Sequence, residues 1–275
     1  AVIGRLLADA GFRVGIIAQP DPKGQDIRRL GEPRLFWGVS GGCVDSMVAN
    51  RTASGRFRKQ DDYTPGGENT RRPDRAVLIY ANLIRAHFKN TCPIVLGGIE
   101  ASLRRIAHYD CWSNAIRRSI LLDAKADFLL YGMAERAVLE LANCLRDGED
   151  PRNIRGLCYP ASEYPQEYVV LPPYEDVVGA SRSAKQAFTR MFRLFYQNND
   201  PITAQGLAQP DRETGGPVVP PGDTSGRQQQ DHGGPHVETP HFLPFGQFLA
   251  RAVRIPGTSR QVGGGTQFAA PDGLH

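Results

Sequence analysis

Two short apolar runs, each closed by glycine, most strongly constrain how this chain can fold. Residues 93–96 run into Gly97 and Gly98, and residues 126–131 run into Gly132. A short apolar run cut off by glycine is typical of a strand that is buried on both faces. Small residues and a carboxylate follow each glycine, as they do where a helix begins. Strand–helix units in series predict a parallel sheet that is covered by helices.

The first 150 residues continue this pattern. Apolar spacing predicts two earlier strands, at residues 12–18 and 35–39. Helices are predicted at residues 1–10, 25–30, 44–53, 101–106 and 135–145, from residue 73 onward, and over part of 112–122. We therefore expect one α/β domain over this part of the chain.

Several short sequence motifs in the first 150 residues occur in the order that is typical of one enzyme family. They are GFRVGIIAQPD (11–21), DDYTP (61–65), RRPDRA (71–76), LGGIEASLRR (96–105), AHYDCWS (107–113) and ADFLLYGMAER (126–136). On these words, residues 1–147 resemble the N-terminal region of the YgiQ family of radical SAM proteins. The resemblance implies a Rossmann-like region followed by a radical SAM barrel. The CxxxCxxC motif of such a barrel holds a 4Fe–4S cluster that cleaves S-adenosylmethionine.

The cysteines of this chain do not form that motif. The closest pair among the five, Cys144 and Cys158, is fourteen residues apart. We therefore expect the barrel, the cluster and S-adenosylmethionine to be absent, and the chain to have no catalytic, cofactor-binding or metal-binding residues of its own. Whether such a fragment is an enzyme stays open. Unclustered cysteines are typical of reduced thiols in a cytoplasmic protein.

Family members begin with a strand that this chain lacks. In a flavodoxin-like order that strand is central, so its absence predicts a gap between the strands at 12–18 and 35–39. The expected fold over residues 1–150 is Rossmann-like (flavodoxin-like or cobalamin-domain-like), with a three-layer parallel sheet. Residues 151–197 are expected to form a small hairpin, from 156–159 and 168–171, and an amphipathic helix. Residues 198–275 are expected to form a mostly disordered or degenerate tail. We also expect the chain to be a fragment that is truncated at both ends.

The loops after the predicted strands are the candidate ligand crevice, because open α/β sheets bind ligands at the carboxyl ends of their strands. Glycine permits close approach, Ser102 with helix amides can bind an anion, and His108 is a candidate general base. The alternative is structural: glycine avoids clashes, Glu100 complements a helix dipole, and the histidine satisfies a local hydrogen bond. The candidates are Gly41, Gly42, Gly97, Gly98, Glu100, Ser102, Arg104, Arg105, His108, Gly132 and Glu135.

Other classes of function lack their signatures. No G-x-G-x-x-G spacing, Walker lysine or D-x-H-x-x-G word is present, so neither nucleotide phosphates nor cobalamin are expected. No apolar run is long enough to span a membrane. With a net charge of only +4, the arginine pairs at 28/29, 71/72, 104/105 and 117/118 are interpreted as solvated faces rather than a nucleic-acid surface.

One long polar connection, residues 54–72, has two interpretations. It is either a mobile surface loop or a lid over the strand ends that uses Asp61, Asp62 and Tyr63.

Two functions are in competition at this point. The first is the accessory N-terminal domain of a YgiQ-like radical SAM enzyme of unknown substrate, with the missing barrel of the same polypeptide as its partner. The second is a stand-alone Rossmann-like module that binds a small anionic molecule beside Gly41, Gly97 and Gly132.

Overall fold

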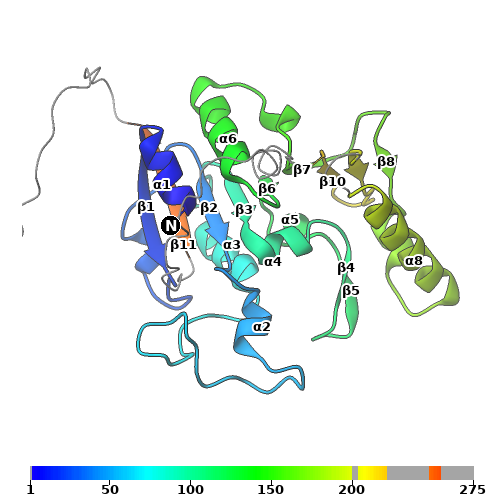
Figure 1. Ribbon diagram of the computed structural model, residues 1–275, viewed down its shortest axis with the longest axis horizontal. Coiled ribbons are helices and arrows are strands. Elements are labelled where there is room, and N and C mark those ends of the chain that lie inside the picture. The colour runs from blue at the N-terminus through cyan, green and yellow to red at the C-terminus, as the bar shows by residue number, and fades with distance from the viewer. Residues whose placement is uncertain (1, 200–203, 222–247, 255–275) are drawn as a thin grey trace, which may run out of the picture.

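Three parallel strands, each of which ends at a glycine or within two residues of one, form the centre of the sheet. The computed structural model describes residues 2–199, 204–221 and 248–254, the last of these by their backbone. Strands β2 (Trp37–Ser40), β3 (Ile94–Gly97) and β6 (Phe128–Leu130) lie side by side and run parallel. Figure 1 shows helices packed around these strands. The α/β, Rossmann-like fold class predicted from the sequence is confirmed.

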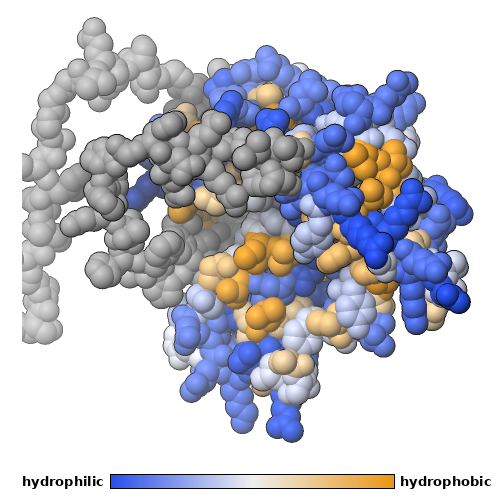
Figure 2. Space-filling view, turned by 45° about the vertical axis from the view of Figure 1, so that its right-hand side comes forward, coloured by the Kyte–Doolittle hydropathy of each residue, from blue (hydrophilic) through white to orange (hydrophobic). Residues whose placement is uncertain are grey.

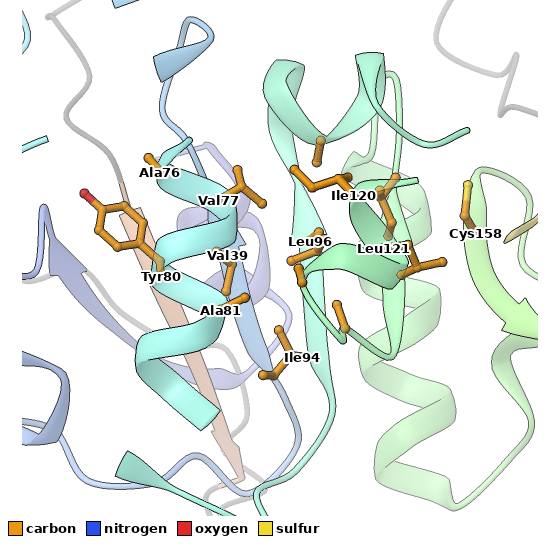
Figure 3. Packing of buried hydrophobic residues seen from close by; sticks show 14 of the residues in the cluster. Val39, Ala76, Val77, Tyr80, Ala81, Ile94, Leu96, Ile120, Leu121 and Cys158 are labelled. Atoms are coloured by element: carbon orange, nitrogen blue, oxygen red, sulfur yellow. The ribbon is translucent and has the colours of Figure 1, made fainter. Parts of the chain in front are cut away.

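Side chains alternate along these strands between two hydrophobic cores, as the pleat requires. Ile94 and Leu96 enter the core that helix α3 (Ala76–His87) covers, and Figure 3 shows them facing that helix. Val95 points to the other core, beneath helices α1 (Val2–Asp9) and α6 (Glu135–Asp147). Burial on both faces explains why the β3 run is continuously apolar.

The remaining elements follow the predicted order with some changes. Residues 112–122 were predicted to be partly helical, and residues 120–122 are, whereas most of the others belong to a hairpin. That hairpin pairs β4 (His108–Asp110) with β5 (Ala115–Arg117), and only α5 (Ile120–Asp123) is helical. The other elements before residue 150 are β1 (Phe12–Ala18), the 3-10 turn Asp26–Arg28, α2 (Ser46–Asn50) and α4 (Gly98–Leu103). The 3-10 turn Pro151–Asn153 follows α6.

Strands β1 and β2 are separated by the width of one strand. Strand β11 (Phe248–Arg254) lies between them, antiparallel to both. The prediction that β1 and β2 do not pair directly is therefore confirmed, but the prediction of an open gap is wrong. A segment from the predicted disordered tail supplies the backbone partners that β1 and β2 would otherwise lack.

The predicted hairpin of residues 156–159 and 168–171 does not form. Strand β7 (Leu157–Ala161) pairs with β6 and with β10 (Gly216–Val219), whereas β8 (Val169–Val170) pairs only with β9 (Leu207–Ala208) at the far edge. Both β9 and β10 come from the stretch that was predicted to be disordered, so that prediction is also wrong for residues 207–208 and 216–219. Residues 200–203, 222–247 and 255–275 of the expected tail lie outside the described part of the chain.

The predicted amphipathic helix is present and longer than expected. Helix α8 (Arg182–Gln197) packs against α7 (Tyr174–Val177) and buries Ala184 and Met191. The Gln209 amide donates to the Met191 sulfur at 3.1 Å, which ties α8 to the β9 region. Among the described residues, no helix has the length and apolar character that a membrane crossing requires.

A matched pair of leucine truncations tests the location of the core. Leu96 is fully buried on β3, so Leu96→Ala should lower the free energy of unfolding by about 2–5 kcal/mol. Leu103 is exposed on α4, so Leu103→Ala should change it by less than about 0.5 kcal/mol. Urea denaturation followed by circular dichroism measures both, and equal losses for the two variants would contradict this core.

Candidate functional site

The loops at the carboxyl ends of the parallel strands converge, as the sequence predicts. Gly41 and Gly42 follow β2, Gly97 and Gly98 join β3 to α4, and Gly132 follows β6. The Ser102 hydroxyl donates to the Gly98 carbonyl at 2.8 Å and lies 3.4 Å from the Gly132 amide nitrogen. The candidates Gly98, Ser102 and Gly132 are thus brought together.

Glu100 is an almost fully buried carboxylate that joins three helices. Its carboxylate oxygens accept hydrogen bonds from the backbone amides of Ser46 (3.0 Å) and Val77 (3.2 Å), near the starts of α2 and α3. Burial raises the pKa of Glu100, although the hydrogen bonds from Ser46 act in the opposite direction. With both oxygens engaged, this carboxylate acts as a structural brace between α4, α2 and α3.

Gly41 lies against this brace, which gives its small size a physical reason. A Cβ atom at position 41 would stand 2.3 Å from the Glu100 Oε2 atom. Gly98 has a similar constraint, because its φ is +80° and a Cβ atom would stand 2.7 Å from the Ser40 hydroxyl. These glycines therefore permit close packing of the strand exits on one another.

Arg104 is engaged by a helix cap. Its guanidinium forms an ion pair with Asp45 and donates to the Glu100 carbonyl at 3.1 Å. Asp45 in turn accepts from the Met47 amide at 2.9 Å and so caps α2. Arg104 thus strengthens the same junction as Glu100.

Arg105 points to a different part of the molecule. Its guanidinium carbon lies 4.5 Å from the centre of the Tyr131 ring and 4.6 Å from that of Phe195 on α8. It donates to the Ser102 carbonyl (2.5 Å) and to the Asn199 side chain (2.8 Å). This buried cation forms no ion pair within the described part of the chain, and the two rings stabilise it. Arg105 therefore links α4 to α8.

His108 lies in a small hollow. Its Nδ1 atom is 3.3 Å from the Ile106 carbonyl oxygen. Burial lowers the pKa of His108 to about 4, and the nearby Arg104 acts in the same direction, while the Ile106 carbonyl opposes them. A base this weak is a poor match for proton abstraction near neutral pH, which favours the structural interpretation of this histidine.

The hollow around His108 is small, with about 20 Å³ of accessible space, and each of its three arginines is paired with a carboxylate. Arg75 forms an ion pair with Asp110, and Arg117 forms one with Asp123 at 3.1 Å. Sequence reasoning missed Arg75, which has a positive φ of 53° just before α3. No local sequence signal marks a non-glycine residue in that conformation. The lining residues are Arg75, Leu78, Glu100, Arg104, His108, Asp110, Arg117, Ile120 and Asp123.

Glu135 stands apart from the other candidates. It begins α6, is half-buried, and makes no hydrogen bond or ion pair with the described residues. A ligand-binding role for it, as for the other loop residues, stays a prediction.

The long connection of residues 54–72 is anchored by buried polar side chains. Asp61 and Arg72 form an ion pair at 2.8 Å with almost no exposed surface. Burial alone would raise the pKa of Asp61, but hydrogen bonds from Thr64 and Arg72 hold it below its usual value. Gln19 donates to Thr64 at 2.9 Å, which ties the loop to the end of β1.

The same connection also reaches the loop after β2. The neighbouring Cys43 side chain, together with burial, raises the pKa of Tyr63, so these two residues lie close together. Asp62 points to solvent. The anchoring of Asp61 and Thr64 argues against a freely mobile loop, and the lid interpretation stays a prediction.

The comparisons with known proteins point to one group. Residues 1–234 match the family model described as "Radical SAM N-terminal". A UPF0313 protein from Fusobacterium nucleatum is 56% identical over 210 residues, which cover 76% of this chain and 36% of that protein. One from Thermotoga maritima is 56% identical over 181 residues, or 64% of this chain and 32% of that protein.

A less similar relative agrees, and it too is much longer than the part that it shares with this chain. A UPF0313 protein from Bradyrhizobium diazoefficiens is 48% identical over 233 residues, covering 76% of this chain and 34% of that protein. The chain thus spans about a third of the length of the curated relatives it matches. No solved structure matches the chain.

Two glycine substitutions test the brace around Glu100. Gly41→Ala places a methyl group against a carboxylate that cannot move without losing its hydrogen bonds, so it should lower the free energy of unfolding by about 1–3 kcal/mol. Gly97→Ala is the control, because its methyl group would meet only the Leu130 carbonyl at 3.8 Å. Urea denaturation compares them, and a Gly41→Ala variant as stable as the control would show that Glu100 is free to shift.

The buried His108 predicts a loss of stability in acid. Its folded pKa of about 4 lies below its ordinary value of 6.5, so the unfolded chain binds more protons between these values. Its contribution is complete above about pH 6.5 and declines as the pH falls toward 4, by roughly 1–3 kcal/mol. Urea denaturation across this range should show a flatter profile for His108→Gln. The control His87→Gln should keep the wild-type slope, and an unchanged slope in both variants would contradict the prediction.

Proposed function

The chain belongs to the radical SAM N-terminal family, and on that premise we propose that it is the accessory N-terminal domain of a YgiQ-like radical SAM enzyme of unknown substrate. The 4Fe–4S cluster and S-adenosylmethionine then bind in a further domain of the longer polypeptide, and the chain alone is inactive. The observation that carries the proposal is that the chain matches the family model over residues 1–234, while its alignments with the relatives cover only about a third of each relative.

The cysteines of this chain do not fit a 4Fe–4S cluster, which requires several thiolates on one side of it. Burial raises the pKa of Cys92 to about 11 and that of Cys158 to about 12, so both thiols stay protonated at neutral pH. Cys43 and Cys111 are exposed in separate loops. Within the described residues, no three His, Cys, Asp or Glu side chains are grouped to hold a metal ion.

An apolar surface at the carboxyl edge of the sheet supports a docking role. Ile99 and Leu103 are four residues apart on one face of α4 and are 50% and 65% exposed. Met133, 71% exposed, follows Gly132, whose amide lies beside Ser102 of α4. We call these three residues the carboxyl-edge patch. Exposed apolar side chains that gather in this way are typical of protein contacts. In the proposed enzyme the catalytic domain covers this patch, and the substrate lies between the two domains.

The hollow around His108 favours a second candidate function, a stand-alone module that binds a small anionic molecule. Three arginines line it. Each of them already contacts a carboxylate, so a bound anion has to displace Asp45, Asp110 or Asp123 from its partner. This competition makes the accessory-domain function the better supported of the two.

A side-by-side reconstitution tests the proposed function. The chain and the full-length relative from Fusobacterium nucleatum are each treated anaerobically with iron, sulfide and S-adenosylmethionine. We expect the visible absorbance of a 4Fe–4S cluster and reductive cleavage of S-adenosylmethionine from the relative, and neither from the chain. Cluster absorbance on the chain would contradict the proposal. Strong thermal stabilisation of the chain by nucleotides, cobalamin or S-adenosylmethionine would instead favour the stand-alone module.

The proposed docking of the catalytic domain on the carboxyl-edge patch can be tested in the full-length relative. Aspartate at the positions equivalent to Leu103 and Met133 should loosen the two domains and speed limited proteolysis between them. The control is aspartate at the position equivalent to Val2, which is exposed on α1, away from the carboxyl-edge patch. Equal proteolysis of the two variants would place the contact between domains elsewhere.

A further inference from the structure

The outward face of α8 is strongly basic, and no carboxylate among the described residues pairs with it. The helix contains Arg182, Lys185, Arg190 and Arg193 and no aspartate or glutamate. All four side chains are exposed, and none forms an ion pair within the described part of the chain. Figure 1 places α8 at the side of the molecule away from β1 and α1.

Several arginines elsewhere in the fold, in contrast, form ion pairs with carboxylates. Arg72 pairs with Asp61, Arg104 with Asp45, and Arg117 and Arg118 pair with Asp123. Of the eight arginines in the pairs that the sequence analysis interpreted as solvated, these four form ion pairs with carboxylates. The basic residues of α8 lie outside these arginine pairs, so the interpretation of the pairs as solvated faces did not include them.

Aromatic rings run beside the basic side chains. Phe188, Phe192 and Tyr196 follow one another at four-residue spacing, with ring centres 6.3 Å and 4.7 Å apart. We call them the aromatic ridge. Phe192 is 49% exposed and Tyr196 is 63% exposed. Exposed rings in a row beside cations are the two components with which proteins bind single-stranded nucleic acid.

The geometry of the helix sets both components on the outward side. Ala184 and Met191 are buried on the inward side, against the sheet extension. The long outward side chains of Arg182, Lys185, Arg190 and Arg193, with Gln186 and Thr189, frame a shallow open hollow. Figure 2, which turns this side of the molecule forward, shows hydrophilic residues with apolar ones between them.

We propose that this face of α8 binds single-stranded RNA or DNA. The four basic side chains contact phosphates, and unpaired bases stack on Phe192 and Tyr196. A membrane surface fits less well, because the main apolar side of the helix is buried and only two rings are free to insert. An acidic protein also fits less well, because the centres of protein interfaces are depleted of charge, whereas here cations surround the rings. The inference does not depend on the proposed catalytic domain.

Charge reversal tests the phosphate contacts. The 275-residue chain is titrated into labelled single strands of about ten nucleotides, as RNA and as DNA, and anisotropy is read at several salt concentrations. Four phosphate contacts give a slope of log K against log salt of about −3. Arg190→Glu with Arg193→Glu should weaken binding at least tenfold and flatten the slope by about 1.4. The control, Lys59→Glu with Lys89→Glu, changes the net charge equally at exposed sites elsewhere and should leave binding within about twofold.

Removing the exposed aromatic rings separates the contribution of base stacking to binding from that of the phosphate contacts. Phe192→Ala with Tyr196→Ala should weaken binding at least fivefold at every salt concentration without changing the slope. Phe57→Ala, which removes an exposed ring far from α8 in sequence, should have no effect. Circular dichroism establishes that each variant is folded before it is titrated.

Several outcomes would overturn the inference. They are no binding at the lowest salt concentration, equal effects of the α8 and control variants, or duplex bound as tightly as single strands. Polyglutamate that competes as well as the oligonucleotide would assign the surface to an acidic protein. Binding to anionic vesicles that exceeds binding to the oligonucleotide would assign it to a membrane.

Discussion

The carboxylate of Glu100 is the interaction on which the arrangement of this domain depends. It accepts from the amides of Ser46 and Val77, and so holds the starts of α2 and α3 against α4 at the edge where the parallel strands end. Arg104 and Asp45 reinforce the junction, and Gly41 leaves room for it. A buried carboxylate is tolerated only when its oxygens are satisfied, and here two backbone donors satisfy them. The candidate crevice is therefore a firmly joined edge rather than a loose set of loops.

The sheet is assembled from segments that are far apart in the chain. β2, β3 and β6 form its parallel centre, β11 separates β1 from β2, and β10 and β9 extend the other side. A strand's backbone groups need partners whichever part of the chain supplies them, and pairing is set by position in the folded domain. This explains how stretches with little apolar content of their own can still be ordered within a sheet.

The distribution of charge divides the molecule into two parts. In the first 150 residues, Arg72, Arg104 and Arg117 pair with carboxylates, and Arg105 lies between aromatic rings. On α8, four cations have no such partners among the residues that the structure describes, and they lie beside an exposed aromatic ridge. The carboxyl-edge patch and the face of α8 are separate surfaces of different chemistry. One suits an apolar protein contact, and the other suits a polyanion.

The sequence alone determined the fold class and the parallel strands, because apolar runs closed by glycine depend on local chemistry that the chain displays directly. The family followed separately, from the resemblance that its sequence motifs carry. The sequence also placed Gly98, Ser102 and Gly132 at a common edge. Tertiary structure alone decided that Glu100 and Arg104 brace helices, that β7 and β8 do not pair, and that residues 207–208, 216–219 and 248–254 become strands. Burial, ion pairing and strand pairing join residues that are distant in sequence, so no local pattern records which partner each of them meets.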